Sequence, residues 1–467
     1  MATIHRMWRD ADLSSLGVAP VSADAPDHIA VEDGLASVVA IRAGEGFLKW
    51  QQLQNIADMI DAKRSIAVES AVDEFARFLD PVKQVAASVA TALHVGQDAG
   101  ETLVDRADAI RNRLPNTGLL LRDGVIACTA FGTAVVETAA IVEPGLLAEA
   151  DREIADRLRS SGDVGYFGVQ RTARAVVTTL DAEAARDARE RAKKTRGIRV
   201  WPAGEGLATL AITNTVENIA LSKAAIEAKE EHDRKADTAT DSGAEGDADT
   251  RTKDERLADA AVALIADPDV EHTGARVVVH VIADGSTLDG GDRPGHLEGH
   301  GAIDAAHVRD IAARPGTLVR PLDLTQLRRG SAQAGNPYRP TALLDTVVRG
   351  LFGGCSWPGC TRPAAACELD HVTEWNADDP DAGGPTCLCN LNPKCTFHHL
   401  LKTFGEGWID DQIIDADGTV WTEVTTPEGH TVRSKARNTW LLPDAGLVPC
   451  GHPPPTRPER WTRPPNR

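Results

Sequence analysis

Side chains that bind metal ions are concentrated in one short part of this 467-residue sequence. Seven of the eight cysteines lie in the last quarter of the chain. Cys355 and Cys360 are separated by four residues, and Cys395 and His398 by two, spacings that are typical of zinc ligands. Two such pairs would occupy all four positions around a tetrahedral ion, so we predict a structural Zn²⁺ at these residues.

Other ligand sets also fit the spacing. Cys395 and His399 are four residues apart, so His399 could replace His398. Since adjacent helical residues point about 100° apart, one of the two histidines would face the zinc and the other the preceding strand. Buried thiols without a metal are another alternative, although clustered cysteines in a reducing compartment favour metal binding over disulfides. Three further cysteines compete for the ligand roles, namely Cys367, Cys387 and Cys389.

A second group of polar residues in this stretch could hydrolyse phosphodiester bonds. The segment ending at Asp370-His371 is predicted as a short strand, a glycine-containing loop leads to Asn390, and a helix carries His399. Hydrolysis needs an activated water and stabilisation of the charge that develops on the phosphate. A neutral imidazole with a pKa of about 6.5 suits the first task, and a divalent cation suits the second.

We therefore predict His371 as the general base, with Asp370 and His399 holding a divalent ion such as Mg²⁺. Asn390 is too weak a base to transfer a proton, so its amide would brace the loop or orient His371. Lys402 lies further along the same helix and could contact a phosphate of the nucleic acid; a solvated lysine is an equal alternative.

The strand itself presents a geometric difficulty. Neighbouring residues on a regular strand point to opposite faces of the sheet, so Asp370 and His371 cannot both face one site. We expect a β-bulge or an abrupt strand end at this position. Without either feature, Glu374 would replace Asp370 as the candidate ligand.

A long, alanine-rich region with mainly helical periodicity precedes this block. Residues 85–93 and 103–114 carry apolar side chains at helical spacing on either side of Val95-Gly96, and Pro115 ends the second run. We interpret them as bundle helices in preference to a helix-turn-helix that docks on DNA. Residues 197–212 are predicted to form a strand, a Pro-Gly turn and a second strand or helix start.

Farther along, residues 231–253 lack apolar periodicity and are predicted to be a linker or surface loop. A capping box of Thr252 and Glu255 then opens a helix, and residues 275–282 should be a strand. We interpret the glycine-rich segment that follows as a solvated loop, because no thiol or carboxylate partner lies at ligand spacing from its three candidate metal ligands, His296, Glu298 and His300.

The charge balance is unfavourable for a nucleic-acid enzyme. Lys and Arg number 50 against 69 Asp and Glu, a formal net charge of −19. DNA binding depends on cations that replace counterions, so a nuclease would have to rely on a local site and bound metal. The Pro- and Arg-rich tail could contact a phosphate backbone. We find neither a signal peptide nor a run of about twenty apolar residues, and expect a cytoplasmic protein with no membrane partner.

The order of the C-terminal residues resembles the HNH endonuclease family, in which two β-strands and an α-helix surround one metal ion. His371, Asn390 and His399 stand where that family has its signature residues, and Asp370 precedes the first. The order DH, GGPT, NL and C-x2-HH-x2-K makes the resemblance specific. It implies a general-base His371, a divalent metal at Asp370 and His399, and an outer zinc on the two cysteine-containing pairs.

Residues from about 30 to 445 also resemble the actinobacterial thirteen-E-twelve repeat family, which joins a helical domain of unknown function to a C-terminal HNH module. The matching segments are LPNT at 114–117, GHGAI at 299–303, YRPTALL at 338–344, Gly407-Trp408 and Asp417-Gly418-Thr419. Two segments depart from the family pattern. GLFGG precedes Cys355 in place of charged residues, which would remove backbone contacts, and Asn392-Pro393-Lys394 precedes Cys395 in place of an apolar segment, which would alter the helix start.

The predicted fold class is α+β. Its expected parts are a flexible arm at 1–30, a mainly helical domain at 31–340, a zinc-supported ββα-metal module with trailing β-hairpins at 341–447, and a disordered tail at 448–467. The leading hypothesis is a divalent-metal endonuclease that acts on DNA. One rival is a catalytically silent, zinc-supported module that binds nucleic acid or protein. Another makes the helical domain an interaction scaffold that the C-terminal module targets.

Overall fold

A computed structural model describes residues 31–69, 80–204, 207–240, 250–265, 280–298, 301–324, 327 and 337–441. The protein has the expected α+β class and divides into two compact units. The first contains the chain up to Ala188 and from Leu318 onward, and the second contains residues 189–317. The region expected as one helical domain, 31–340, is therefore split between the units, because residues 189–317 contact mainly one another. The expected arm and tail lie outside the described residues.

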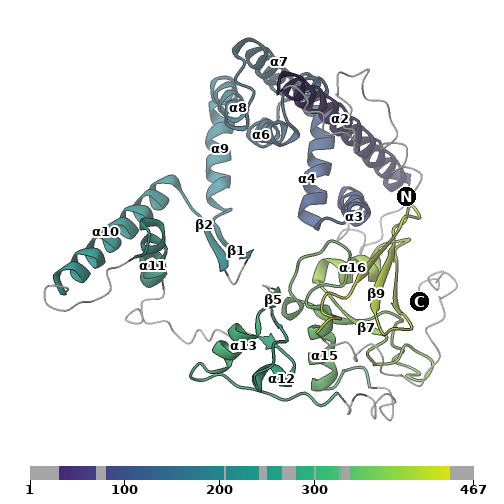
Figure 1. Ribbon diagram of the computed structural model, residues 1–467. Helices are drawn as coiled ribbons and strands as arrows, with labels where there is room; N and C mark the ends of the chain where they lie inside the picture. Colours follow the sequence, from purple (N-terminus) through teal and green to yellow (C-terminus); the bar gives the residue numbers. More distant parts are fainter. Residues whose placement is uncertain are drawn as a thin grey trace. The chain divides into compact units, whose positions relative to one another are not determined.

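The first unit begins with a helical bundle (Figure 1). Its elements are α2 (Val31–Glu69), α3 (Pro81–Leu93), α4 (Gln97–Asp108), the π-helical turn η3 (Ala109–Arg113), α5 (Pro115–Arg122), α6 (Cys128–Thr138), α7 (Pro144–Ser161), α8 (Tyr166–Leu180) and the first part of α9 (Ala182–Lys193), a helix that continues into the second unit. Apolar residues at helical spacing form one buried core, with Leu53, Ile110 and Phe131 among its members. Burying each such side chain stabilises the bundle by about 1.5–3 kcal/mol. None of the helices in the described ranges is both long and apolar enough to cross a membrane.

The helix pair expected around Val95-Gly96 is confirmed as α3 and α4. The Asp80 carboxylate caps α3 by accepting a hydrogen bond from the amide of Val82. His94 ends the helix with a φ of 55°, in the left-handed region. Both helices pack against α2, as bundle helices do. Pro115, expected to end a helix, also begins the next one, because a proline in the first turn loses no hydrogen bond.

A buried carboxylate explains the LPNT segment. Asp151, on α7, is only 1% exposed. It accepts hydrogen bonds from the backbone amides of Asn116 and Thr117, and from the side chains of the same two residues. These amides belong to the first turn of α5, where helical N–H groups have no partner in the helix and a negative charge is favourable. The segment is thus a docking point between α5 and α7.

The second unit contains β1 (Gly197–Gly204), β2 (Leu207–Thr213), α10 (Val216–Thr240), α11 (Lys253–Ile265), β3 (Val281–Ile282), α12 (Gly285–Leu288), β4 (Gly295–Leu297), β5 (Gly301–Ile303) and α13 (Ala305–Ala312). The strand expected at the start of 197–212 is confirmed, and the second element, expected as a strand or a helix start, is a strand, so that β1 and β2 form an antiparallel hairpin. The capping box of α11 is also confirmed, since the Thr252 amide donates to the Glu255 carboxylate and the Glu255 amide donates to the Thr252 hydroxyl.

Two expectations for this unit were wrong. The linker predicted over 231–253 is helical as far as Thr240, because ion pairs one turn apart, such as Lys235 with Glu231, support α10. Residues 241–249 lie outside the described part of the chain. His296, predicted in a solvated loop, is a buried residue of β4, which pairs with β3 on one side and β5 on the other. Glu298 follows β4, whereas His300 and most of the strand expected over 275–282 are not among the described residues.

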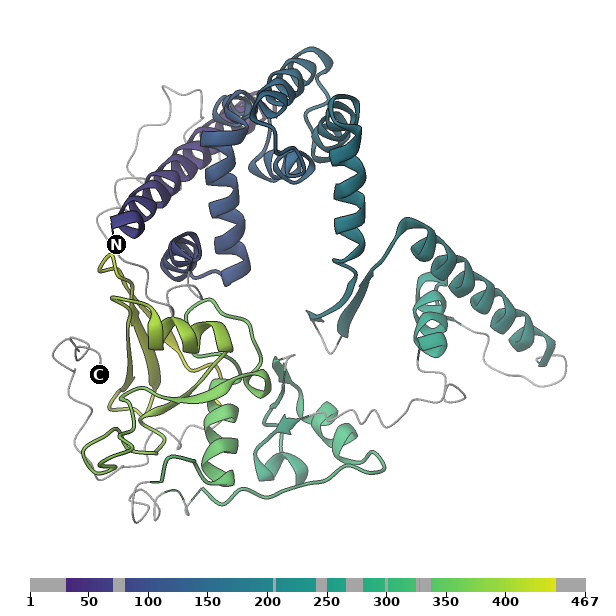
Figure 2. The same ribbon diagram turned by 180° about the vertical axis from the view of Figure 1, so that it is seen from behind.

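The C-terminal part of the first unit carries the candidate site. Its elements are α15 (Ala342–Phe352), the 3-10 turn η4 (Ala364–Ala366), β6 (Glu368–His371), β7 (Leu391–Lys394), α16 (Thr396–Phe404), β8 (Ile409–Ile414), β9 (Val420–Thr425) and β10 (Thr431–Lys435). β6 and β7 form an antiparallel pair that leads directly into α16, and β8 to β10 form a meander. Two opposite views show α16 beside these strands (Figures 1 and 2).

Candidate metal centre

Four side chains converge in the C-terminal part of the first unit. Cys355, Cys360, Cys395 and His398 are all buried, and one ligand atom from each lies within 4.8 Å of the others. His398 Nδ1 is 3.5 Å from Cys355 Sγ and 3.2 Å from Cys395 Sγ. In a tetrahedral zinc site, bonds of about 2.3 Å to sulfur and 2.1 Å to nitrogen separate these atoms by about 3.6 Å. The cluster can therefore hold a metal ion such as zinc.

Local backbone geometry places these ligands. The chain turns between Cys355 and Cys360 at Gly359, which has a φ of 77°, a conformation that glycine adopts without a steric cost. Cys395 is the N-cap residue of α16, and His398 lies in the first turn of that helix. The cap position and the next turn lie on the same side of a helix. The C-x2-H pair is therefore aimed by the start of α16.

Four alternative ligands lie outside this cluster, namely Cys367, Cys387, Cys389 and His399. The sulfur atoms of Cys387 and Cys389 are 3.0 Å apart. The sulfur of Cys355 accepts a hydrogen bond from the backbone amide of Cys395. Because the thiolate is the form that binds metals, an N–H donor at this sulfur favours coordination at Cys355.

An aromatic layer covers the cluster. The Trp357 ring stacks on the His398 ring, with centroids 4.8 Å apart and planes 9° apart, and Trp408 packs on Trp357 at 5.4 Å. The indole nitrogen of Trp357 donates a hydrogen bond to the hydroxyl of Thr91, on α3. These contacts exclude water and hold the imidazole in one orientation. Trp408 belongs to the Gly407-Trp408 segment noted in the sequence, which thereby acquires a structural role.

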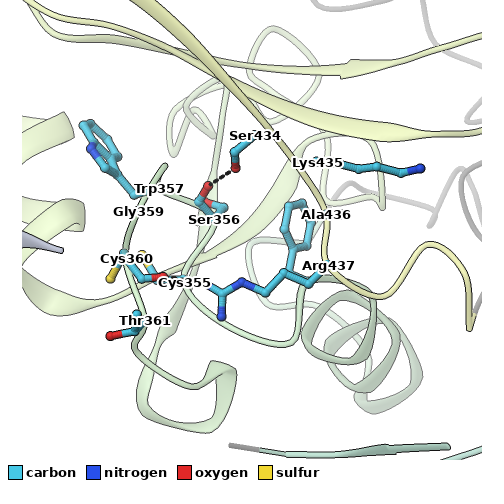
Figure 3. Close-up of a pocket in the computed structure, with 11 residues that line it drawn as sticks. Cys355, Ser356, Trp357, Gly359, Cys360, Thr361, Ser434, Lys435, Ala436 and Arg437 are labelled. Carbon is cyan, nitrogen blue, oxygen red and sulfur yellow. Dashed lines mark hydrogen bonds between the residues drawn. The ribbon is translucent and has the colours of Figure 1, made fainter. Parts of the chain in front are cut away.

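A hollow of about 270 Å³ adjoins the cysteines (Figure 3). The guanidinium of Arg437 points toward the two cysteines and donates to the carbonyl oxygen of Cys360. Ser434 Oγ lies 3.5 Å from the carbonyl oxygen of Ser356, the interaction drawn as a dashed line in Figure 3. The polar groups around the hollow therefore hold the turn that carries the first two ligands.

A second polar group joins β6 to α16. Asp370 Oδ1 is 3.4 Å from His399 Nε2, and the other ring nitrogen, Nδ1, is 2.6 Å from Glu368 Oε2. Glu368 and Asp370 are two positions apart on a strand and so point to the same face. The structure thus brings Asp370 and His399 together and adds a carboxylate that the sequence analysis did not single out. Among the described residues, no third His, Cys, Asp or Glu ligand joins this pair in a compact group.

Two lysines contact the other oxygen of Asp370. Lys402 Nζ is 2.9 Å from Oδ2 and also donates to the carbonyl oxygen of His371. Lys394 is completely buried, with its ammonium 3.2 Å from Asp370 Oδ2 and 2.7 Å from Asp410 on β8. Burial alone would raise the pKa of Asp370, but the two ammonium groups lower it overall, so this carboxyl is charged. The Asn392-Pro393-Lys394 segment, expected to affect the helix start, forms β7 instead.

His371 is buried at the end of β6. Its Nε2 is 2.8 Å from the hydroxyl of Thr386, and its ring stacks on Tyr338 with centroids 5.5 Å apart. Burial lowers the pKa of His371, so the ring is neutral near pH 7. The β6–β7 register is regular up to His371, which excludes the bulge and leaves the strand end as the feature that occurs. The side chains of Asp370 and His371 accordingly contact different groups.

Asn390 braces the loop between β6 and β7. Its amide nitrogen donates to the carbonyl oxygens of Thr373 and Pro385, and its side-chain oxygen accepts a hydrogen bond from the amide of Thr373. The Asn390 side chain that makes these hydrogen bonds is fully buried. Asn390 thereby fixes the segment that carries Thr386, the partner of His371. Glu374, the reserve candidate for Asp370, is exposed.

Four residues around this site were not predicted from the sequence to take part in it. Glu368 had a usable signal, because it lies two strand positions before Asp370. Tyr338 lies in the YRPTALL segment, whose Thr341 caps α15. Thr386 lies in the GGPT segment and Lys394 in the Asn392-Pro393-Lys394 segment, but the spacing indicated a partner for neither residue, because loop closure and sheet packing bring the partners to them.

Comparison with known proteins assigns the larger part of the chain to a family. The family model described as "Domain of unknown function (DUF222)" matches residues 49–349, more than half of the sequence. The chain belongs to the DUF222 family. The match ends shortly before Cys355, so it does not bear on the metal cluster of this DUF222 member.

Three proteins of Mycobacterium tuberculosis are similar to this DUF222 chain. "Uncharacterized protein MT2160", of strain CDC 1551 / Oshkosh, and "Uncharacterized protein Rv2100", of strain ATCC 25618 / H37Rv, are each 30% identical over 400 residues, or 74% of this chain and 68% of theirs. "Uncharacterized protein Rv3776", of the H37Rv strain, is 32% identical over 249 residues, covering 44% of this chain and 46% of its own. No solved structure matches.

Proposed function

We propose that this protein is a divalent-metal-dependent endonuclease of the HNH type that hydrolyses phosphodiester bonds in DNA. The supporting observation is the distance of 3.4 Å between Asp370 Oδ1 and His399 Nε2, contributed by a strand and the helix that follows. Two atoms bound in adjacent positions of one ion, with bonds of about 2.1 Å, lie about 3.0–3.4 Å apart. The pair therefore has the spacing of two ligands that share an ion.

The environment of His371 suits a general base. Its lowered pKa keeps the ring neutral at the pH of a cell. With its proton on Nε2, donated to the Thr386 hydroxyl 2.8 Å away, the neutral ring would present Nδ1 as the nitrogen that takes a proton from water. Asn390 holds the loop that carries Thr386, and stacking on Tyr338 limits rotation of the imidazole. The hydrogen bond to Thr386 and the stacking on Tyr338 therefore orient the His371 ring, and Asn390 supports the first of them.

The two metal sites have different tasks in this proposal. A zinc ion on the buried cluster would anchor the first turn of α16 and so fix His399, the residue after the zinc ligand His398. A divalent ion at Asp370 and His399 would stabilise the charge on the phosphate oxygens and the departing oxygen. Lys402 adds a positive charge beside Asp370, where a phosphate would approach.

Plasmid nicking with Mg²⁺ or Mn²⁺ tests the proposal. We expect the wild-type protein to nick supercoiled DNA and His371→Ala to be slower by about 10²–10⁴-fold, the usual contribution of a general base. His430→Ala is the matched control, because His430 is an exposed histidine on the turn between β9 and β10. Equal rates for wild type and His371→Ala would refute the assignment of the base.

One observation favours a second function, a catalytically silent zinc-supported module that binds nucleic acid or protein. Asp370 already has two ammonium partners, Lys394 and Lys402, which would compete with an incoming cation. In that case zinc-loaded protein would bind DNA equally well with and without EDTA and would cut none with any divalent metal. Metal-dependent nicking that is lost in His371→Ala excludes this alternative.

A further inference from the structure

We infer that Glu368 is a positioning residue for a divalent ion at Asp370 and His399, and that its carboxylate both selects the tautomer of His399 and supplies negative charge to the site. This inference rests on the proposed metal site, although not on the chemistry of DNA cleavage. Glu368 contacts Nδ1 of His399, whose Nε2 faces Asp370, so this carboxylate acts through the imidazole.

The tautomer follows from the hydrogen bond. A neutral imidazole carries one proton on one of its two nitrogens. Glu368 Oε2, 2.6 Å from Nδ1 of His399, is an acceptor and therefore holds that proton on Nδ1. Nε2 keeps its lone pair, and Nε2 is the nitrogen 3.4 Å from Asp370 Oδ1. The carboxylate thus directs the metal-binding nitrogen toward the second ligand, as partners of ligating histidines commonly do.

The strand enforces this arrangement. Glu368 and Asp370 lie on the same face of β6, opposite Lys394 and Asn392 of β7. His399 projects toward that face from the first turn of α16, which follows Cys395 at the N-cap position. The side chains of Glu368 and His399 are 59% and 31% exposed, so one side of the imidazole is open to solvent, whereas Asp370 is only 9% exposed. The bond to Glu368 restricts the rotation of this partly exposed ring.

The charges around the pair give Glu368 a second effect. The carboxylates of Asp370 and Asp410 are matched by the ammonium groups of Lys394 and Lys402. Among these five side chains, Glu368 therefore carries the unmatched negative charge, since its partner His399 is neutral when it binds a metal. Without this carboxylate, a divalent cation would approach a group with no net attraction for it.

Mn²⁺ binding to the zinc-loaded, full-length protein without DNA tests the inference, with titration calorimetry and electron paramagnetic resonance as readouts. We expect Glu368→Ala to weaken binding by about 10–100-fold. Glu368→Gln should weaken it less, because the amide oxygen still accepts the Nδ1 proton although the charge is lost. The matched control is Glu406→Gln, which removes the same charge from an exposed residue just after α16 and should change the affinity less than about twofold.

A second readout separates positioning from a structural role. Nitrogen NMR of histidine-labelled protein should show His399 protonated on Nδ1 in the wild type and in Glu368→Gln, and a mixture of tautomers in Glu368→Ala. Unchanged Mn²⁺ affinity in Glu368→Ala overturns the inference. The inference also fails if the wild type binds no Mn²⁺, or if its Mn²⁺ binding is the same in His399→Ala. If the wild type binds Mn²⁺ in this way but nicks no plasmid, the endonuclease proposal fails while the role of Glu368 stands.

Discussion

Replacement of Lys394 by methionine would remove a buried cation that joins β7 to β8. The ammonium is fully buried between Asp410 and Asp370, whose side chains are only 2% and 9% exposed. Burial alone would lower the pKa of Lys394, but the two carboxylates raise it above its ordinary value. Lys394 is therefore charged in the folded state, and its stabilisation is complete below the pKa of a free lysine and is lost only at still higher pH.

The expected loss of stability can be worked from these contacts. Removing one partner of a buried ion pair costs about 3–5 kcal/mol, because the remaining charge is left without compensation. Lys402 still contacts Asp370 at 2.9 Å in the variant, so most of the loss falls on Asp410. We therefore expect Lys394→Met to lower the free energy of unfolding by about 3 kcal/mol, the lower end of that range.

Urea denaturation followed by tryptophan fluorescence measures this change, because Trp357 and Trp408 are buried in the same module. A double variant, Lys394→Met with Asp410→Leu, removes both charges and should recover most of the loss. Lys435→Met, at an exposed lysine on β10, is the control and should stay within about 0.5 kcal/mol of the wild type. A single Lys394→Met variant as stable as this control would refute the reasoning, as would a double variant no better than the single one.

Three further predictions follow from the described contacts. Metal analysis of the purified protein should find about one zinc per chain, and Cys395→Ala should lose both the zinc and the cooperative unfolding of the C-terminal module, because such an ion contributes about 10–16 kcal/mol in small zinc modules. Asp151→Ala should destabilise the helical bundle by about 2–3 kcal/mol in thermal unfolding, since it leaves first-turn amides of α5 without an acceptor, whereas Asp156→Ala, at an exposed position on the same helix, should be neutral. Because burial lowers the pKa of His371, nicking should retain its full rate down to the ordinary histidine range and fall only below about pH 6.5; a rate that falls already above pH 7 would contradict the assigned base.

Several features of this protein follow from local spacing. The C-x4-C and C-x2-H pairs come together because a glycine turn and a helix cap each aim two side chains within a few residues. The capping box of α11 and the β1–β2 hairpin are likewise encoded by residues that are close in the sequence. Hydrogen bonds and ligand bonds of this kind depend on three or four neighbouring positions, so residue types and their order are sufficient to predict them.

The burial of charged groups does not follow from local spacing. In the sequence, Lys394 lies where the resembled family has an apolar segment. Sheet packing nevertheless encloses it between the carboxylates of two other strands. Glu368 and His399 are 31 residues apart, and only the placement of α16 against β6 makes them partners. His296 is likewise buried, on the strand between β3 and β5, although the sequence predicted a solvated loop.

The sequence by itself therefore determined which four residues form the metal cluster, where several helices and strands lie, and the α+β class. Tertiary structure alone decided which oxygen of Asp370 meets His399, which charges are compensated, and that residues 189–317 form a unit of their own. The physical reason is that a local hydrogen bond is fixed by a few backbone angles, whereas the surroundings of a buried charge depend on the packing of segments far apart in the chain.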